Sequence, residues 1–325
     1  MPSLFTEDTF EQAVIELFEH MGYVHIYAPD MDRDYLSPIL SPVLRDSLVR
    51  INKGLSWEAI DEAISKLKNF DTGSLIQKNM IFMDYLQNGI TVKYFTKGEE
   101  RSSIVKLIDY SRADNNTFYV VNQFTFLENG NNRRPDIILF INGLPLVLME
   151  LKSPSKDEVG AENAYNQIRN YMQDIPSMFY YNAICVISDL SVNKAGTITS
   201  GFDRFMEWKN KDGEHENTAF AAFDTFYEGM FQRERLLDIL KNFILFSSDG
   251  KKNIKILAGY HQYFAVKKAI EKAKIATKTD GKGVSCKFFL EKVAGIFGEC
   301  CISVLEKVAT PWSGRCHPME ADILC

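Results

Sequence analysis

The stretch from Arg134 to Lys152, RPDIILFINGLPLVLMELK, constrains the fold of this chain more than any other. Two apolar runs, Ile137 to Ile141 and Leu144 to Met149, flank Asn142-Gly143, a residue pair typical of tight turns between antiparallel strands. Short apolar runs of this kind fit strands that lie inside a sheet. The stretch therefore predicts a buried β-hairpin.

Three charged residues stand at the open end of this hairpin, where a buried strand would otherwise continue apolar. Residues i and i+2 of a strand point to one face, so Glu150 and Lys152 emerge together while Leu151 points into the opposite layer. If the loop holds three residues, 142–144, the register places Asp136 directly opposite Glu150. We therefore expect two carboxylates and an ammonium to converge at this end.

A carboxylate held against apolar packing is unfavourable unless a cation or hydrogen-bond donors satisfy it. Mg²⁺ (or Mn²⁺) is a suitable cation, because it takes few carboxylate oxygens, keeps several waters and accepts a backbone carbonyl. We expect Asp136, Glu150 and the Leu151 backbone carbonyl to hold this metal, which leaves Lys152 beside a metal-bound water. The alternative is a surface hairpin that carries an exposed ion pair, worth only about 0 to 1 kcal/mol.

A helix is predicted directly after the hairpin, from Ser155 to Asp174, because small and apolar residues recur there at helical spacing and Pro176 follows its end. Gln167 and Tyr171 are four positions apart. They therefore lie on one face of this helix.

The hairpin motif, Pro135-Asp136 followed by Glu150-Leu151-Lys152, resembles the core of PD-(D/E)xK nucleases. The Gln-x-x-x-Tyr helix right after it resembles the RecB-like branch of that family. The resemblance implies an α/β fold, a PD-(D/E)xK nuclease core with a mixed central β-sheet flanked by helices. It also implies that the three charged hairpin residues are catalytic and that Gln167 and Tyr171 support the geometry of substrate or metal.

An N-terminal helical segment is predicted before this core. Thr6 can cap a first helix that carries an apolar stripe and has Gly22 at its stop position. Three packing helices follow between Leu36 and Gly89. Glu11 of the first helix looks like the glutamate that many RecB-like nucleases carry close to the metal. The alternative is a solvated acidic first turn, favoured by the helix dipole.

The sheet is predicted to begin after these helices, in segments rich in β-branched and aromatic residues that are separated by polar turns. The expected strands are Ile90 to Phe95, Ile104 to Tyr110, Phe118 to Phe126 and, beyond the hairpin and its helix, Ala183 to Ser188.

Polar residues close to the hairpin have open assignments. Arg133 and Arg134 precede the aspartate and can either hold a DNA phosphate at the mouth of the site or balance its carboxylates. Gln123 lies inside a predicted strand, and we expect its amide to hydrogen-bond backbone rather than substrate.

Composition limits how such a chain meets DNA. Its 325 residues carry a net charge of −6 and a pI of about 5.5, which argues against coating nucleic acid through overall charge, so any DNA contact must be local. The polar N-terminus and the lack of a long apolar run predict no signal peptide and no membrane segment. A cytoplasmic location is the corresponding expectation.

A broader resemblance covers about residues 1 to 285. The segments NNTFYVVNQFTF, RRPDIILFINGLPLVLMELKSP, NAICVISD and FDRFMEWK resemble, in this order, the R subunit of type I restriction enzymes. The resemblance implies an endonuclease domain, residues 1–235, that hydrolyses DNA phosphodiester bonds without intrinsic sequence specificity. In that family the domain is fused in front of a DNA-translocating ATPase, and it works with modification and specificity subunits as partners.

Residues 236–285 are predicted to be a linker and the incomplete beginning of a helicase-like motor domain. Tyr260 and Gln262 match the segment where such motors contact adenine, which makes them candidate nucleotide-binding residues. ATP is expected only for the intact family member, because no Gly-rich phosphate loop follows Gly281. ATPase activity is therefore not expected from this chain.

Residues 286–325 form an anomalous tail that holds every cysteine except Cys185, at spacings that fit no usual zinc site. This departure suggests a gene that is rearranged or frame-shifted from about Val284 onward. The alternative is a divergent but genuine pair of helices.

Two other functions stay open beside the type I endonuclease. The chain can be a non-catalytic docking fragment that needs the motor and the partner subunits. It can also be a free-standing Mg²⁺-dependent DNA nuclease, which would act on linear DNA without ATP.

Overall fold

The structure is a computed structural model and describes residues 6–276 except residues 71, 97, 153–159, 190, 218–222, 249 and 251. It divides into two compact units, Met1–Leu257 and Ala258–Cys325. The described part of the second unit is residues 258–276, which consist mainly of helix α9, Tyr260–Ala276. All other elements described below belong to the first unit.

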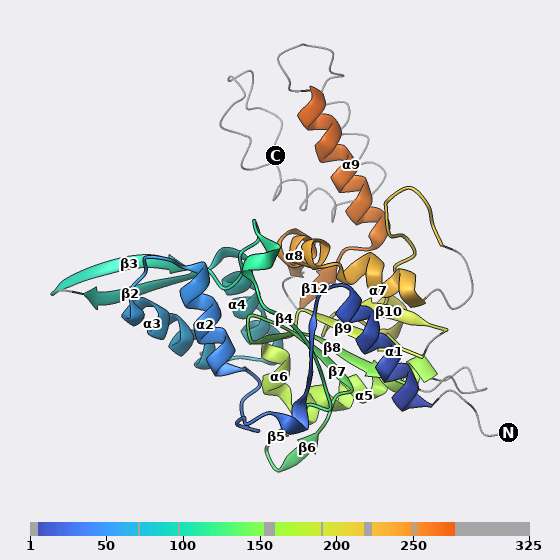
Figure 1. The fold of residues 1–325 in the computed structure, drawn as a ribbon, viewed down its shortest axis with the longest axis horizontal. Helices are drawn as coiled ribbons and strands as arrows, with labels where there is room; N and C mark the ends of the chain where they lie inside the picture. Colours follow the sequence, from blue (N-terminus) through green and yellow to red (C-terminus); the bar gives the residue numbers. More distant parts are fainter. Residues whose placement is uncertain are drawn as a thin grey trace. The chain divides into compact units, whose positions relative to one another are not determined.

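A six-stranded sheet forms the centre of the first unit, with the strand order β1-β4-β7-β8-β9-β10 (Figure 1). Two neighbouring pairs, β1–β4 and β8–β9, are parallel and the other pairs are antiparallel, which confirms the predicted mixed sheet. The strands are β1 Val24–Tyr27, β4 Phe118–Asn122, β7 Ile137–Ile141, β8 Leu144–Leu151, β9 Ile184–Ser188 and β10 Asn193–Gly196.

Helices flank this sheet as predicted. Helix α5, Gly160–Asp174, contacts β8 and β9, and the short α6, Pro176–Tyr180, packs on α5. Ile168 of α5 lies in one buried cluster with Leu148 of β8 and Ile187 of β9. The start that the sequence predicts for this helix, at Ser155, lies outside the described residues.

The N-terminal helical segment is confirmed. Helix α1, Glu7–His20, starts with a capping box in which the Thr6 hydroxyl accepts from the backbone of Thr9. Gly22 follows its end with φ +85°, a conformation that suits glycine. The helix contacts β1, β4 and β8, and Glu7 in its first turn lies 3.6 Å from the Lys152 ammonium, directly after the end of β8.

The three packing helices are confirmed as α2 Ser41–Ile51, α3 Trp57–Lys68 and α4 Leu75–Asn88. A separate hairpin, β2 Ile90–Thr96 and β3 Glu99–Val105, packs against α3 and projects beside α2 and α3 in Figure 1. The prediction that the segments from Ile90 and Ile104 begin the central sheet is therefore wrong.

Two predicted strands end early, each for a local reason. The strand expected from Ile104 to Tyr110 ends at Val105, because Asn52 takes both backbone hydrogen bonds of Lys106. The strand expected from Phe118 to Phe126 ends at Asn122, because the next residue, Gln123, has a φ of +56° that breaks extended pairing.

Several elements were not predicted from the sequence. The edge strand β1 is one. The predicted linker from residue 236 contains the second part of helix α8, which ends at Asn242, and then strand β11, which begins at Ile244. The remaining elements are β5 Phe126–Glu128, β6 Asn131–Arg133, α7 Phe223–Phe231, α8 Arg233–Asn242, β11 Ile244–Ser248 and β12 Asn253–Leu257.

The predicted boundary between residues 235 and 236 stays a prediction, and the anomalous tail 286–325 lies outside the described residues. Within the described part of the chain, no helix combines the length and apolar character needed to cross a membrane.

Candidate active site

The β7–β8 hairpin reaches the predicted register by a different route. Its turn holds two residues rather than three, because Ile141 pairs with Leu144 across Asn142 and Gly143, both with positive φ. The register then shifts by one residue between Leu139 and Phe140, so that Ile137 pairs with Met149. One step further along, Asp136 lies opposite Glu150.

The two carboxylates at this end are held differently. Asp136 accepts a hydrogen bond from the backbone N–H of Leu151 at 2.7 Å, and its own carbonyl accepts from the N–H of Gln123 at 3.2 Å. Glu150 is 2% exposed and accepts from the Lys152 ammonium at 2.7 Å through Oε1. Its other oxygen, Oε2, is buried and has no hydrogen-bond partner among the described residues.

Lys152 lies among several oxygens. Its Nζ contacts Glu150 Oε1 at 2.7 Å, the Leu151 carbonyl at 2.9 Å and Glu7 at 3.6 Å. The backbone N–H of Lys152 donates to the Ser188 carbonyl of β9, which fixes the end of β8 against its parallel neighbour. The ammonium thus occupies a position between two of the oxygens expected to hold a metal.

Burial controls the protonation of this group. Burial raises the pKa of Glu150 to about 8, and the nearby Asp136 adds to the rise while Lys152 opposes it. Burial also raises the pKa of Asp136 to about 6, against the hydrogen bond from Leu151. For Lys152, burial lowers the pKa, but the Glu150 carboxylate outweighs it and the net pKa is raised. Lys152 is therefore charged at neutral pH.

Helix α5 brings its two expected residues to the site. The Tyr171 hydroxyl donates to the Arg134 carbonyl at 3.5 Å. Burial raises the pKa of Tyr171 above its usual range and the Glu150 carboxylate adds to the rise, while a hydrogen bond with the Gln167 side chain lowers it in part. Tyr171 is therefore neutral, and both the Glu150 carboxylate and the Gln167 side chain lie close enough to its hydroxyl to affect its pKa.

Glu11 does not form the solvated acidic turn that was its alternative assignment. Its two oxygens accept from the side-chain amides of Asn122 at 2.7 Å and Gln123 at 2.9 Å. The expectation that the Gln123 amide binds backbone is therefore wrong. Together with Glu7, Glu11 raises the pKa of Asp136, so α1 adds negative charge to the site.

Neither arginine next to the hairpin forms an ion pair with Asp136 or Glu150 in the described part of the chain. Arg133 binds Asp174 at the end of α5, with Nε and a terminal nitrogen both 2.7 Å from one carboxylate oxygen. Arg134 has an exposed side chain, and its backbone carbonyl accepts from Tyr171. The alternative that Arg133 balances Asp136 and Glu150 is wrong; a phosphate contact stays a prediction for both.

Glu7 is the site residue that the sequence reasoning did not assign. It lies one helical turn before Glu11, so the spacing of two glutamates on one face of α1 is a signal for it. Its contact with Lys152 depends on how α1 packs across β8, which the spacing does not reveal.

The donor set fits a hard divalent cation. The described residues contain no group of three or more histidine, cysteine, aspartate or glutamate side chains that could hold a metal ion. The candidate ligands are therefore two carboxylates and one backbone carbonyl, and water would have to complete the shell. Asp136, Glu150 and the Leu151 carbonyl supply oxygen only, and Glu150 Oε2 is unpartnered. Mg²⁺ takes few protein oxygens and completes its shell with water, whereas structural zinc requires four protein ligands, often cysteine or histidine.

The candidate adenine contacts lie in the second unit, on the first turn of α9. The Gln262 side chain accepts a hydrogen bond from the backbone N–H of Gly259 at 2.9 Å and so serves the start of that helix. A nucleotide role for Tyr260 and Gln262 stays a prediction.

Comparison with known proteins gives a consistent result. The model of the family described as the type I restriction enzyme R protein N terminus matches residues 4–204. This range includes every residue of the hairpin site and of α5.

Curated relatives carry related descriptions. The chain is 33% identical over 292 residues to the type I restriction enzyme HindI endonuclease subunit of Haemophilus influenzae, covering 86% of this chain and 28% of that protein. It is 30% identical over 288 residues to the putative type I restriction enzyme MjaIXP endonuclease subunit of Methanocaldococcus jannaschii, covering 81% and 27% respectively. The chain thus spans about a quarter of the length of these relatives.

Proposed function

Because this chain belongs to the family of type I restriction enzyme R protein N termini, we propose that it cleaves DNA by Mg²⁺-dependent hydrolysis of phosphodiester bonds, without intrinsic sequence specificity. The observation that carries the proposal is the environment of Glu150. This carboxylate is buried with one oxygen unpartnered, next to a second carboxylate and an ammonium. Buried charge of this kind is unfavourable in a scaffold, but it suits a site that binds a cation.

Asp136, Glu150 and the Leu151 carbonyl would hold the metal, and Glu11 supplies further negative charge nearby. When bound, Mg²⁺ supplies Lewis acidity toward a DNA phosphate and favours ionisation of water at neutral pH.

Lys152 acts as a charged hydrogen-bond donor rather than as a base, because its raised pKa keeps Nζ protonated at neutral pH. Its ammonium can orient the attacking water and stabilise the negative charge that develops on the phosphate. Tyr171 stays neutral and orients Glu150, while Gln167 holds the Tyr171 side chain. These two residues position the carboxylate and are not expected to contact the reacting atoms.

Sequence specificity is expected to come from outside this chain. The relatives are named as endonuclease subunits of type I restriction enzymes, so modification and specificity subunits are the expected partners. For the longer R protein, the proposal also includes an ATP-driven motor.

The test is calorimetric titration of the purified chain with Mn²⁺, beside Asp136→Ala, followed by a DNA-nicking assay without ATP. The proposal expects saturable binding that the substitution abolishes. It also expects nicking of unrelated DNA sequences by the wild type.

Two other outcomes discriminate the rival functions. Metal binding without nicking indicates a site that needs the motor and the partner subunits before it cuts. Failure to bind metal overturns the proposal and favours the non-catalytic docking fragment.

A further inference from the structure

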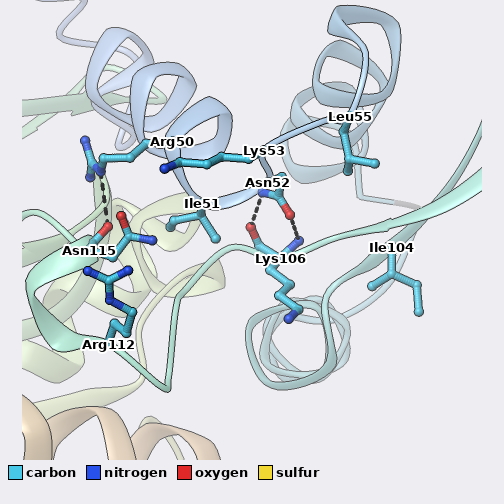
Figure 2. A pocket seen from close by; sticks show the side chains of 9 residues that line it. All are labelled: Arg50, Ile51, Asn52, Lys53, Leu55, Ile104, Lys106, Arg112 and Asn115. Carbon is cyan, nitrogen blue, oxygen red and sulfur yellow. Dashed lines mark hydrogen bonds between the residues drawn. The ribbon is translucent and has the colours of Figure 1, made fainter.

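A second concentration of charge lies away from the candidate active site. A hollow of about 340 Å³, named here the basic pocket, is lined by four cationic side chains (Figure 2). Arg50 comes from α2, Lys53 from the loop after it, Lys106 from the residue after β3, and Arg112 from the segment before Phe118. No carboxylate lines this hollow.

The charges of the basic pocket are not neutralised by the described residues. Lys53, Lys106 and Arg112 are exposed and form no ion pair within the described part of the chain. The two acids nearest Arg112 along the chain have other partners: Asp114 pairs with Arg233 at 3.1 Å, and Asp109 accepts from Ser111, Asn115 and the backbone N–H of Arg112. Four positive charges thus gather on a chain whose net charge is −6.

Hydrogen bonds hold the pocket in shape. Asn52 bonds both backbone groups of Lys106, at 2.8 and 2.9 Å, and so joins the end of α2 to the chain after β3, as Figure 2 shows. Arg50 donates through Nε to the Asn115 carbonyl at 3.1 Å and through a terminal nitrogen to Thr117 at 2.8 Å. Because all of these acceptors are neutral, Arg50 is oriented without losing its charge.

The residue types that line the basic pocket indicate which kind of ligand it can bind. A small-molecule pocket is commonly apolar and aromatic, but no aromatic side chain lines this hollow and three of its four cations are exposed. Bases are bound by stacking on rings or by reading base edges, whereas phosphates are bound by Arg and Lys. The lining therefore suits phosphate groups on an extended polyanion.

We propose that the basic pocket binds phosphates of the DNA backbone, independently of sequence, as a second DNA contact apart from the cleavage site. This inference rests on the proposed function. Because the chain cannot attract DNA through its overall charge, a local cluster of cations supplies the electrostatic contact that cleavage of a polyanion requires.

The two DNA contacts lie near opposite ends of the β7–β8 hairpin. Thr117, which Arg50 binds, also donates its backbone N–H to Asn142 in the hairpin turn, whereas Glu150 lies at the far end of β8. At about 3.3 Å per residue, the eight residues of β8 span roughly 25 Å, which corresponds to about seven base pairs of duplex DNA. Substitutions in the pocket therefore leave the metal site intact.

The test uses the full chain with Lys53→Gln, Lys106→Gln and Arg112→Gln combined. The control combines Lys93→Gln, Arg101→Gln and Arg204→Gln, which remove the same charge from exposed cations that each have a carboxylate partner. Fluorescence anisotropy in metal-free buffer measures the binding of two duplexes of unrelated sequence across a salt series. Mn²⁺ titration and thermal melting of both variants report the cleavage site and the fold.

The pocket variant is expected to bind both duplexes roughly ten-fold or more weakly at about 0.1 M salt, and the slope of log affinity against log salt is expected to fall by about 2 to 3. The change in log DNA affinity of the control variant should be less than half of the change in the pocket variant. Both variants should retain Mn²⁺ binding, which separates this result from a failure of the proposed function.

Equal DNA affinity in the two variants overturns the inference while leaving cleavage unaffected. The inference is also overturned if the wild type binds Mn²⁺ and nicks DNA while the pocket variant binds DNA as tightly as the wild type does. Inorganic pyrophosphate tests a smaller ligand: binding that the pocket variant loses, without a change in DNA affinity, overturns the inference in favour of a free phosphate compound.

Discussion

The Glu150 carboxylate is buried beside Asp136, and this proximity disfavours its charged form in the folded chain. The shift of its pKa to about 8 expresses the same cost, since burial and the neighbouring carboxylate favour the protonated form. One oxygen of Glu150 also lacks a donor among the described residues. Removing the Glu150 charge is thus expected to raise the free energy of unfolding. It is also expected to abolish metal binding, because Glu150 is a proposed ligand.

Glu150→Gln tests that expectation with little change in side-chain volume. In metal-free buffer at pH 8, the free energy of unfolding should be unchanged or higher by about 1 to 4 kcal/mol, because a buried ionisation cost disappears. Mn²⁺ binding and DNA cleavage should be abolished. Urea unfolding, calorimetry and a nicking assay measure these three quantities.

Glu99→Gln is the matched control, since Glu99 is exposed and pairs with Arg101 at 3.4 Å. It should change neither stability nor metal binding. A loss of stability in Glu150→Gln of more than about 2 kcal/mol would give Glu150 a structural role instead.

Lys152→Met separates metal binding from catalysis. The ammonium contacts Glu150 Oε1 and the Leu151 carbonyl, so its removal leaves both oxygens available to a metal. Mn²⁺ affinity should therefore be equal or higher, while cleavage should fall by roughly 100-fold or more, because a charged donor next to the phosphate is lost. Calorimetry and single-turnover cleavage measure the two effects, and unchanged cleavage would contradict the assigned role.

The sequence predicted the convergence of Asp136, Glu150 and Lys152, because alternation along a strand and pairing across a hairpin are local rules. The partners of Glu11 and Arg133 followed no local rule. Glu11 meets amides that lie more than a hundred residues away, and Arg133 binds Asp174 of α5. Contacts of this kind depend on how helices pack on the sheet.

At the scale of elements, helix α5 supports the site through Tyr171 and Gln167. Tyr171→Phe and Gln167→Ala should each lower cleavage by about 10- to 100-fold while leaving the melting temperature nearly unchanged, because they orient Glu150 without contacting the substrate. Tyr165→Phe is the control, since that hydroxyl binds the Ser200 carbonyl outside the site. Wild-type activity in both site variants would reduce this face of α5 to packing.

The hairpin turn makes a second element-scale prediction. A Cβ at Gly143 would lie 2.7 Å from the Leu40 carbonyl and from the Leu44 nitrogen, and the φ of Gly143 is +81°. Gly130 has a similar φ of +79° but open space around it. Gly130→Ala should cost about 1 kcal/mol from backbone strain alone, and Gly143→Ala about 1 to 3 kcal/mol more.

Urea unfolding of both glycine variants measures this difference. Equal losses would mean that α2 moves away from the turn at little cost. Because the hairpin carries Asp136 and Glu150, Gly143→Ala should also weaken Mn²⁺ binding, which Gly130→Ala should leave unchanged.

Turn chemistry explains where element prediction succeeded and where it failed. Asn142-Gly143 identified the hairpin, but the sequence did not reveal the register shift near Phe140 that brings Asp136 opposite Glu150. The four-residue strand β1 was missed, since its neighbour β4 lies about a hundred residues away. Short edge strands and irregular pairings depend on tertiary contacts more than on propensity.

At the scale of the whole molecule, protonation at the site makes stability depend on pH. The folded pKa values of Asp136 and Glu150, about 6 and about 8, lie above their ordinary values of 3.8 and 4.5. The folded chain therefore binds more protons than the unfolded chain in this range. Without metal, their contribution to stability is fully present below about pH 4 and is lost as the pH rises to about 8.

A bound metal reverses this trend, because it requires both carboxylates in their charged form and displaces their protons. The rise in melting temperature caused by excess Mg²⁺ should therefore be small at pH 5.5 and should grow up to about pH 8. Thermal melts with Mg²⁺ and with a chelator, across this pH range, measure the difference.

The difference between the two melts isolates the site from other titrating groups. Burial lowers the pKa of Lys255 to about 7, so its contribution makes stability rise with pH above that value. Lys255 lies on β12, and its ammonium donates to the Asn182 carbonyl, so its effect is the same with and without metal and cancels. The combined variant Asp136→Asn, Glu150→Gln should show no Mg²⁺ effect at any pH. If that variant kept the pH-dependent rise, the metal would bind elsewhere on the molecule.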